Sequence, residues 1–306
     1  MAGPAAGRMP AVSLAAVPGR RLRTLELAAD IERRGFSGIY GPSFGDVMAL
    51  CASLAHVTDH VPFGPTILPI YIRRAADVAQ TASYVAEVSG GRLRLGLGVS
   101  HGPAHDRLGV SVGKPLADMR SYVVDVREAV GERGTVPPII LATLRRRMLE
   151  LAVEIGDGAV WANGARSHMA ESLSIVPPDR RAAGFFVGNM IPTVIDDDRD
   201  AAAAVNRRTL SGYVALPNYR NSWKEAGYVE EMEAIEKALA AGERERVPEL
   251  MSDRWLADVT LFGPASEVRD GIEAWFDAGV DTPIIVPSAT SGGQMKALEN
   301  LFDVYA

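Results

Sequence analysis

Short apolar runs alternate along this chain with longer stretches in which apolar residues recur every three or four positions. The short runs predict strands, and the longer stretches predict amphipathic helices. Strands are expected at residues 12–17, 37–41, 61–68, 93–99, 138–143, 158–163, 184–190 and 283–286. Helices are expected at residues 21–34, 46–57, 76–88, 115–130, 168–175 and 294–304, with one more directly after Thr143. This alternation predicts an α/β fold with a parallel (β/α)8 TIM barrel rather than an open, doubly wound sheet.

Residues 196–281 interrupt the alternation, because they are too long for a simple connection between strands. Helices are expected there at 228–239 and 266–278, whereas no strand pattern and few large apolar residues are seen. We therefore expect a helical excursion over the barrel mouth, within a single domain of residues 1–306; a separate domain is the alternative. The three aspartates at 196–198 predict a helix N-cap with an acidic first turn. Cations, amides and aromatic side chains mix at 206–208 and 217–223, which suits a lid, a subunit contact or a plain solvated surface.

Charge and composition narrow the class of protein. The formal net charge is −6 without long blocks of like charge, which disfavours nucleic acid and an acidic membrane surface as partners. No apolar run approaches the roughly 18 residues of a membrane span. Cys51 is the single cysteine and falls in a helical pattern, so we expect a buried thiol and neither a disulfide nor a thiolate metal cluster. A strand and a helix explain residues 1–17 as well as a secretory signal does, so we expect a cytoplasmic protein.

The carboxyl ends of the predicted strands carry the candidate chemistry, because these ends form one face of a barrel. The end segments are 41–43, 68–71, 100–102, 143–145, 163–165 and 189–190. They offer hydroxyl, imidazole, amide and guanidinium groups but no carboxylate pair and no cluster of metal ligands. Hydrolysis by paired acids or by zinc is therefore disfavoured. Polar groups without a nucleophile are typical of a site in which a cofactor supplies the chemistry.

His101 is the leading candidate for catalysis. It follows Ser100 at a strand end, where an imidazole can move a proton or hold a cofactor ring. The alternative is a loop histidine bonded to the backbone. His105 is expected at the surface. Arg145 begins a run of three arginines at a helix start, where the helix dipole disfavours cations. The run suits a phosphate or a substrate carboxylate, and surface pairing with Glu150 and Glu154 is the alternative.

Three stretches in order carry a resemblance to a known family. They are Phe-Gly-Pro-Thr-Ile-Leu-Pro-Ile-Tyr-Ile-Arg at 63–73, Ala-Gln-Thr-Ala at 79–82, and the segment 89–101, which begins Ser-Gly-Gly-Arg and ends Gly-Leu-Gly-Val-Ser-His. Gly-Pro-Thr at 64–66 also indicates a bulge in the third strand. From about residue 21 to 286 the chain resembles the bacterial luciferase-like monooxygenases, and within them the branch with deazaflavin-dependent oxidoreductases.

The resemblance implies a flavin or deazaflavin across the barrel mouth. It implies that the bulge holds a non-proline cis peptide at Thr66-Ile67 behind the cofactor ring. The cofactor-binding positions implied in this way are Ser43, Thr66, Ile67, Gly98, Ser100, His101, Ala162, Asn163 and Gly164, with Arg145 suited to a phosphate. Two departures from the family pattern leave the proton donor and the substrate class open. Pro42-Ser43 replaces the frequent acid-histidine pair, and Arg73-Arg74-Ala75 replaces the usual Arg-His-Pro.

We therefore expect a luciferase-like oxidoreductase with His101 as its catalytic residue and a small organic substrate. The cofactor is the deazaflavin coenzyme F420, which is slightly favoured, or FMN. With FMN, a separate reductase would supply reduced flavin for a monooxygenase reaction. The alternative is a barrel that binds flavin without turnover, as a carrier or sensor. A homodimer is expected, because it is the commonest assembly of soluble oligomers.

Overall fold

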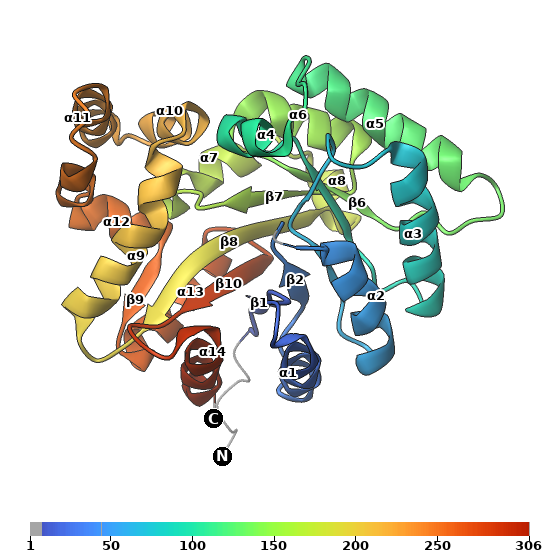
Figure 1. The fold of residues 1–306 in the computed structure, drawn as a ribbon, viewed down its shortest axis with the longest axis horizontal. Coiled ribbons are helices and arrows are strands. Elements are labelled where there is room, and N and C mark those ends of the chain that lie inside the picture. Colours follow the sequence, from blue (N-terminus) through green and yellow to red (C-terminus); the bar gives the residue numbers. More distant parts are fainter. Residues whose placement is uncertain (1–7, 44, 306) are drawn as a thin grey trace. The chain divides into compact units, whose positions relative to one another are not determined.

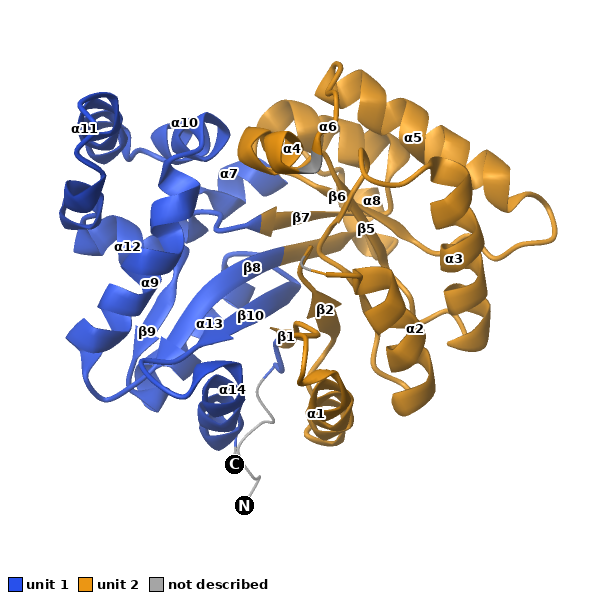
Figure 2. Cartoon of the chain, in the orientation of Figure 1, with its two compact units in different colours: residues 1–10, 162–173, 189–306 blue, residues 11–161, 174–188 orange. Residues whose placement is uncertain are grey.

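The fold is built from parallel strands that alternate with helices (Figure 1). The computed structural model describes residues 8–43 and 45–305. The chain forms two compact units (Figure 2). We call residues 11–161 with 174–188 the N-terminal unit, and residues 1–10 with 162–173 and 189–306 the C-terminal unit. The single domain expected for residues 1–306 stays a prediction, and residues 1–7 of the suggested secretory signal lie outside the described residues.

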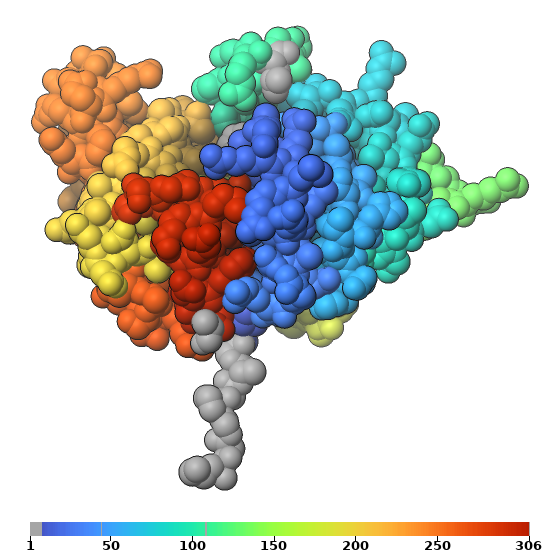
Figure 3. All heavy atoms as spheres, turned by 60° about the horizontal axis from the view of Figure 1, so that its bottom comes forward, coloured from blue at the N-terminus to red at the C-terminus, as the bar shows by residue number. Residues whose placement is uncertain are grey.

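The N-terminal unit contains the predicted alternation of strands and helices. Its strands are β1 (Ala11–Ser13), β2 (Ile39–Gly41), β3 (Phe63–Pro65), β4 (Leu68–Pro69), β5 (Leu95–Gly98), β6 (Ile139–Ala142), nearly all of β7 (Gly158–Ala162) and the start of β8 (Phe186–Ile195). Its helices are α1 (Arg21–Arg33), α2 (Val47–Val57), α3 (Ala75–Val88), α4 (Gly102–Leu108), α5 (Pro115–Val130), α6 (Arg146–Ile155) and α8 (Pro178–Ala182). Helices α1 and α2 lie side by side (Figure 3). The helix predicted at 115–130 is confirmed by α5, which starts at a proline and buries Met119, Val123 and Val126.

The C-terminal unit continues β8 and holds the helices described for residues 196–281, the predicted excursion. It contains a 3-10 turn η1 (Arg166–His168), α7 (Met169–Leu173), α9 (Arg199–Val214), α10 (Pro217–Glu225), α11 (Val229–Ala240), η2 (Arg244–Leu250), α12 (Asp253–Val259), β9 (Leu261–Gly263), α13 (Ala265–Asp277), β10 (Thr282–Ser288) and α14 (Gly293–Val304). The N-cap predicted at 196–198 is confirmed. Asp198 precedes α9, and its carboxylate accepts a hydrogen bond from the Ala201 N–H at 2.9 Å.

The strands form one parallel sheet that returns to its starting strand. Their order is β3-β2-β1-β10-β8-β7-β6-β5-β4, and β9 pairs with β8. The two ends of this order, β3 and β4, are parts of one strand that is interrupted at Thr66 and Ile67. Phe63 in β3 also exchanges backbone hydrogen bonds with Arg92 and Arg94, just before β5, at 3.2 and 2.8 Å. The predicted (β/α)8 barrel is therefore confirmed.

Two glycines let β3 and β5 approach each other where the sheet closes. A Cβ atom on Gly64 would overlap the carbonyl oxygen of Arg94, and one on Gly96 would overlap the carbonyl oxygen of Pro65. The obstacle is backbone in both cases, so a side-chain rotation cannot relieve it. These two glycines therefore determine how closely the interrupted strand packs against β5.

Two charged side chains anchor the loop between α2 and β3, at the amino-terminal ends of the strands. Arg92 donates hydrogen bonds to the carbonyls of Ala55, Thr58, Val61 and Ser89 and to the Thr58 hydroxyl. Glu32 of α1, which is 7% exposed, accepts the backbone N–H groups of residues 59, 60 and 61. Arg92, the arginine of the Ser-Gly-Gly-Arg motif, thus stabilises the fold at the amino-terminal ends of the strands, whereas the candidate site lies at their carboxyl ends.

Replacing Glu32 by glutamine is expected to lower the free energy of unfolding by about 1–3 kcal/mol at pH 7, because an amide cannot accept all three N–H groups. Burial raises the pKa of Glu32, but the backbone N–H groups of residues 60, 61 and 59 outweigh it, so the net pKa is lowered. A lowered pKa gives stability that is present above the unfolded value of about 4.3 and is lost as the pH falls through the folded value. Urea unfolding at several pH values tests this: the difference between wild type and Glu32→Gln should shrink below about pH 4. A difference independent of pH would contradict it.

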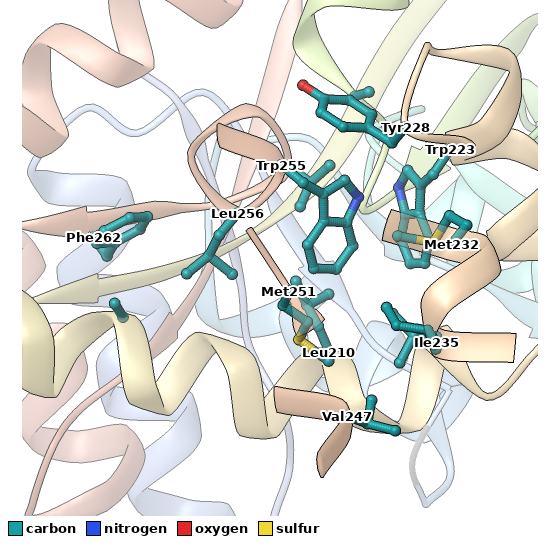
Figure 4. Packing of buried hydrophobic residues seen from close by; sticks show 14 of the residues in the cluster. Leu210, Trp223, Tyr228, Met232, Ile235, Val247, Met251, Trp255, Leu256 and Phe262 are labelled. Atoms are coloured by element: carbon teal, nitrogen blue, oxygen red, sulfur yellow. The ribbon is translucent and has the colours of Figure 1, made fainter. Parts of the chain in front are cut away.

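The expectation that residues 196–281 hold no strand and few large apolar residues is wrong. Leu261–Gly263 forms β9, which pairs in parallel with residues 193–195 of β8. This pairing explains why β8 extends to Ile195, beyond the predicted end at 190. The unit also buries a cluster of large apolar side chains (Figure 4), among them Leu210, Trp223, Tyr228, Met232, Ile235, Val247, Met251, Trp255, Leu256 and Phe262. The apolar residues are spread over several helical segments and β9, so no single stretch of sequence looks hydrophobic.

The single cysteine and the apolar character of the helices can be compared with what the composition predicted. Cys51 is buried in α2, as predicted, and burial raises the pKa of its thiol to about 12. Across residues 8–43 and 45–305, none of the helices combines the length and the apolar character that a membrane crossing requires.

Candidate active site

Ring and glycine contacts identify which residues of the N-terminal unit face the barrel interior. The rings of Tyr40 in β2 and Phe186 in β8 are 5.7 Å apart between centroids, although other strands separate β2 from β8 in the sheet. Both rings therefore point inward. A Cβ on Gly158 would meet the side chains of Phe186 and Ile140, so Ile140 faces inward as well. Because side chains alternate along a strand, Ala142 also faces the interior, at the carboxyl end of β6.

Small residues form a wall at the carboxyl ends of β5 and β6. A Cβ on Gly98 would lie 2.7 Å from the Ile67 side chain and 3.1 Å from the Ala142 Cβ. The structure therefore brings Ile67 and Gly98, both predicted site residues, into contact next to Ala142. The absence of a side chain on Gly98 therefore leaves room for the Ile67 side chain, which packs against β5 beside Ala142.

The peptide bond between Thr66 and Ile67 is cis, as the family resemblance implied. It lies in the predicted bulge, which is confirmed because β3 ends at Pro65 and β4 begins at Leu68. Thr66 is buried, and its N–H donates a hydrogen bond of 2.7 Å to the carbonyl of Gly41 at the end of β2. Ile67 is half-buried. The bulge thus presents Ile67 beside Gly98, while Thr66 fastens the bulge to β2.

Ser100 and His101 follow β5 at the same end of the barrel. Ser100 has a φ of 60°, a left-handed conformation that is uncommon for a residue with a side chain. His101 occupies the N-cap position of α4 and is half-buried. Its Nδ1 is buried and has no hydrogen-bond partner within the part of the chain that the structure describes. Burial, with smaller contributions from His105 and Arg107, lowers the pKa of His101, so the neutral imidazole is the form favoured at neutral pH.

The expectation of a surface position for His105 is wrong. Its imidazole is half-buried, and Nε2 lies 2.6 Å from the Val99 carbonyl oxygen. The ring also packs edge-on against Tyr71 at 5.4 Å, and the Tyr71 hydroxyl donates a hydrogen bond of 2.8 Å to Asp118 in α5. Burial and the bond to Asp118 raise the pKa of Tyr71. This chain of contacts holds the backbone immediately before Ser100. Sequence spacing alone did not reveal it, because its members come from three segments.

Ser43 and Arg145 lie at strand ends but have no described contact with the wall at Ile67 and Gly98. Ser43 is exposed after β2. Arg145 is exposed at the N-cap position of α6. The next arginine, Arg146, forms an ion pair of 2.8 Å with Glu150, so surface pairing accounts for part of the run. Their roles in cofactor binding stay predictions. Among the residues placed by the structure, no three His, Cys, Asp or Glu side chains gather as metal ligands would.

In the C-terminal unit, the end of β7 presents Ala162, Asn163 and Gly164. Asn163 is 4% exposed and has a φ of 57°, the second left-handed residue other than glycine in the described chain. Its N–H bonds to the Met190 carbonyl at 3.0 Å, and its own carbonyl accepts the Trp223 indole N–H at 2.9 Å. The Gly164 N–H donates to the side-chain oxygen of Asn189 at 3.2 Å. The sequence does not predict that Trp223 and Asn189 contact this loop, because nothing in a single sequence links positions so far apart.

A side-chain amide is buried at the same place. The side-chain nitrogen of Asn163 is buried and finds no hydrogen-bond partner among the described residues. Burial raises the pKa of the Tyr213 hydroxyl, and the neighbouring Asn163 amide partly offsets this increase. A buried amide without a geometrically good partner is the kind of donor that a bound ligand can satisfy.

Sequence comparisons identify relatives over most of the chain. A protein of Mycobacterium tuberculosis that carries the name of a coenzyme F420-dependent oxidoreductase is 25% identical over 326 aligned positions, covering 90% of this chain and 93% of the relative. The 5,10-methylenetetrahydromethanopterin reductase of Archaeoglobus fulgidus is 24% identical over 284 positions, covering 83% of this chain and 85% of the relative.

Solved structures show the same fold. The coenzyme F420-dependent tetrahydromethanopterin reductase of Methanopyrus kandleri has a TM-score of 0.74 at 17% identity, covering 96% of this chain and 97% of that one. The FMN complex of the oxygenating constituent of 3,6-diketocamphane monooxygenase from Pseudomonas putida has a TM-score of 0.61 at 16% identity, covering 97% and 96%. The family model described as luciferase-like monooxygenase matches residues 12–282. Because this model matches most of the chain, the chain belongs to the luciferase-like monooxygenase family.

Proposed function

We propose that this protein is an oxidoreductase that uses the deazaflavin coenzyme F420 to exchange a hydride with a small organic substrate. The wall of Ile67, Gly98 and Ala142 carries the proposal, because its apolar residues pack together beside the cis peptide and would support a flat ring. Members of this family include F420-dependent and flavin-dependent oxidoreductases, and the two sequence relatives above are an F420-named oxidoreductase and a pterin reductase.

The described residues fit a planar three-ring cofactor. Ile67 would back the ring, and Gly98 would leave room for the Ile67 side chain against β5. The unpartnered Nδ1 of His101 would face polar groups of cofactor or substrate. The Arg145 guanidinium would suit a phosphate group of the cofactor. A bound deazaflavin would supply or accept the hydride.

His101 would move the accompanying proton. A hydride exchange at a carbon bonded to oxygen requires a proton to leave or join that oxygen in the same overall reaction. The lowered pKa of His101 keeps its imidazole neutral at pH 7, so it can accept a proton in the oxidation direction and return that proton in reduction. The contacts of His105 would hold the loop in which His101 lies.

The second candidate is an FMN-dependent monooxygenase component, with reduced flavin delivered by a separate reductase. It is favoured by the FMN complex among the structural relatives and by the same wall, which does not discriminate between the two ring systems. A homodimer and a cytoplasmic location stay predictions.

Titration of the purified protein with coenzyme F420 and with FMN tests the proposal. Micromolar binding of F420, with FMN at least tenfold weaker, is expected, followed by turnover of F420 with a panel of alcohols and carbonyl compounds. Gly98→Ala should weaken binding, because its methyl group would overlap the Ile67 side chain and displace it from the wall. Gly212→Ala in α9 is the matched control, because its new methyl group would meet no atom within 4 Å. Tight binding of FMN alone would favour the second candidate, and binding of neither would overturn both.

A further inference from the structure

The loop that follows β7 is fastened to the helices of residues 196–281. Asn163 begins this loop in a left-handed conformation, and its carbonyl accepts a hydrogen bond of 2.9 Å from Nε1 of Trp223 in α10. Sixty residues separate this donor from its acceptor. The bond fixes the peptide plane between Asn163 and Gly164, and therefore the direction in which the buried Asn163 amide leaves the backbone.

A second set of bonds holds the other end of the loop. Asp258 of α12 is 7% exposed and accepts the backbone N–H of Ser167 at 3.0 Å and its hydroxyl at 2.6 Å. The Tyr228 hydroxyl donates to the same carboxylate at 2.8 Å. Burial and the bond to Asp258 raise the pKa of Tyr228 to about 12, so this hydroxyl keeps its proton and remains a donor. Charge-assisted bonds to a carboxylate are stronger than bonds between neutral groups.

The donors themselves cannot move freely, because they belong to the buried apolar cluster (Figure 4). Trp223 is 1% exposed and packs edge-to-face on Trp255, with ring centroids 4.9 Å apart and an angle of 84°. Trp255 is fully buried, and its own Nε1 makes no hydrogen bond within the described residues. In Figure 4, Tyr228 lies above this pair. Tight packing of large rings restricts each donor to one position.

We propose that residues 196–281 act as a positioning scaffold for the loop 163–168, in place of the lid considered from the sequence. Trp223 and Asp258 are its positioning residues, one at each end of the loop. The scaffold keeps Asn163 and Gly164 in one arrangement, in which the buried Asn163 amide remains a donor for an acceptor atom of a ligand. This inference rests on the proposed function for the identity of the cofactor, whereas the ordering of the loop does not depend on it.

Two variants with the same loss of volume separate positioning from packing. Trp223→Phe removes the N–H that holds Asn163, and Trp255→Phe removes an N–H that bonds nothing in the described chain. Both leave a similar space in the same cluster. In cofactor-free protein, we expect amide hydrogen exchange of a peptide covering 163–168 to become at least fivefold faster in Trp223→Phe than in Trp255→Phe. A peptide from α11 serves as the internal reference for general loosening.

Binding provides the second readout. Trp223→Phe and Ser167→Ala should raise the Kd for F420, or for FMN if that is the ligand, by about fivefold to tenfold, as the loss of one hydrogen bond predicts. Trp255→Phe should stay within twofold of wild type, and kcat at saturating cofactor should change little in all three. Equal exchange and equal Kd in the two tryptophan variants would overturn the scaffold. Wild type that binds neither coenzyme would refute the proposed function, while the exchange comparison would still decide whether the segment orders the loop.

Discussion

Replacing Gly96 by alanine is expected to destabilise the protein by about 3 kcal/mol or more, the upper range for overpacking in a closed interior. Its new methyl group would overlap the carbonyl oxygen of Pro65, which is backbone and belongs to the bulge before the cis peptide. The strand β5 would have to move away from β3, and the hydrogen bonds of Phe63 that close the barrel would lengthen or break. Urea unfolding followed by circular dichroism measures the loss, and Gly64→Ala should behave in the same way.

Gly212→Ala is the control for this substitution. Its methyl group would meet no neighbour within 4 Å, and alanine favours a helix interior over glycine by about 0.5–1 kcal/mol, so this variant should be as stable as wild type or slightly more stable. Wild-type stability of both Gly96→Ala and Gly64→Ala would contradict the close approach of β3 and β5 at these glycines.

Replacing His101 by asparagine is expected to lower kcat by about 10²- to 10⁴-fold, the usual contribution of a general acid or base. The Kd for the cofactor should change by less than about threefold, because the wall at Ile67 and Gly98 remains. In wild type the pH profile of kcat/KM should rise with pH and reach its plateau below 6.5, the ordinary pKa of histidine, since burial lowers the pKa of His101 and the neutral form is the one proposed to accept a proton. Stopped-flow and steady-state rates from pH 4.5 to 8.5 would measure both.

His56→Asn is the matched control, because His56 is exposed at the end of α2. It should leave both kcat and the pH profile unchanged. A His101→Asn protein that keeps more than about a tenth of the wild-type kcat would remove His101 from catalysis. A Kd that rises as far as kcat falls would instead make His101 a binding residue.

Much of the barrel could be predicted from the sequence, because each of its strand-helix units has a local apolar period. The helix at 115–130 and the strand at 139–142 are examples in which pattern and structure agree within a residue or two. The strand β9 could not be predicted in this way. Leu261–Gly263 has three residues, too few for a period, and its strand conformation depends on pairing with β8.

Part of the candidate site could be proposed from the sequence, and part of it depends on distant partners. Ser100 and His101 follow a predicted strand end, whereas Ile67 and Gly98 were implied as site residues by the family resemblance. The contacts of His105 with Val99 and Tyr71, and of Trp223 with Asn163, join segments whose distance in sequence carries no signal. Tertiary contacts of this kind require the fold before they can be seen.

The positions of Arg92 and Glu32 bear on how such an enzyme can acquire new substrates. Both hold the loop between α2 and β3 at the amino-terminal ends of the strands, whereas Ser100 and His101 follow the carboxyl end of β5. Within the N-terminal unit, the bonds of Arg92 and Glu32 and the residues that would meet the substrate thus lie at opposite ends of the strands. Random libraries restricted to residues 42–43, 72–73 and 102–103, which spare His101 and the contact between Tyr71 and His105, should therefore retain a large fraction of folded members. These positions are the place to begin laboratory evolution of specificity.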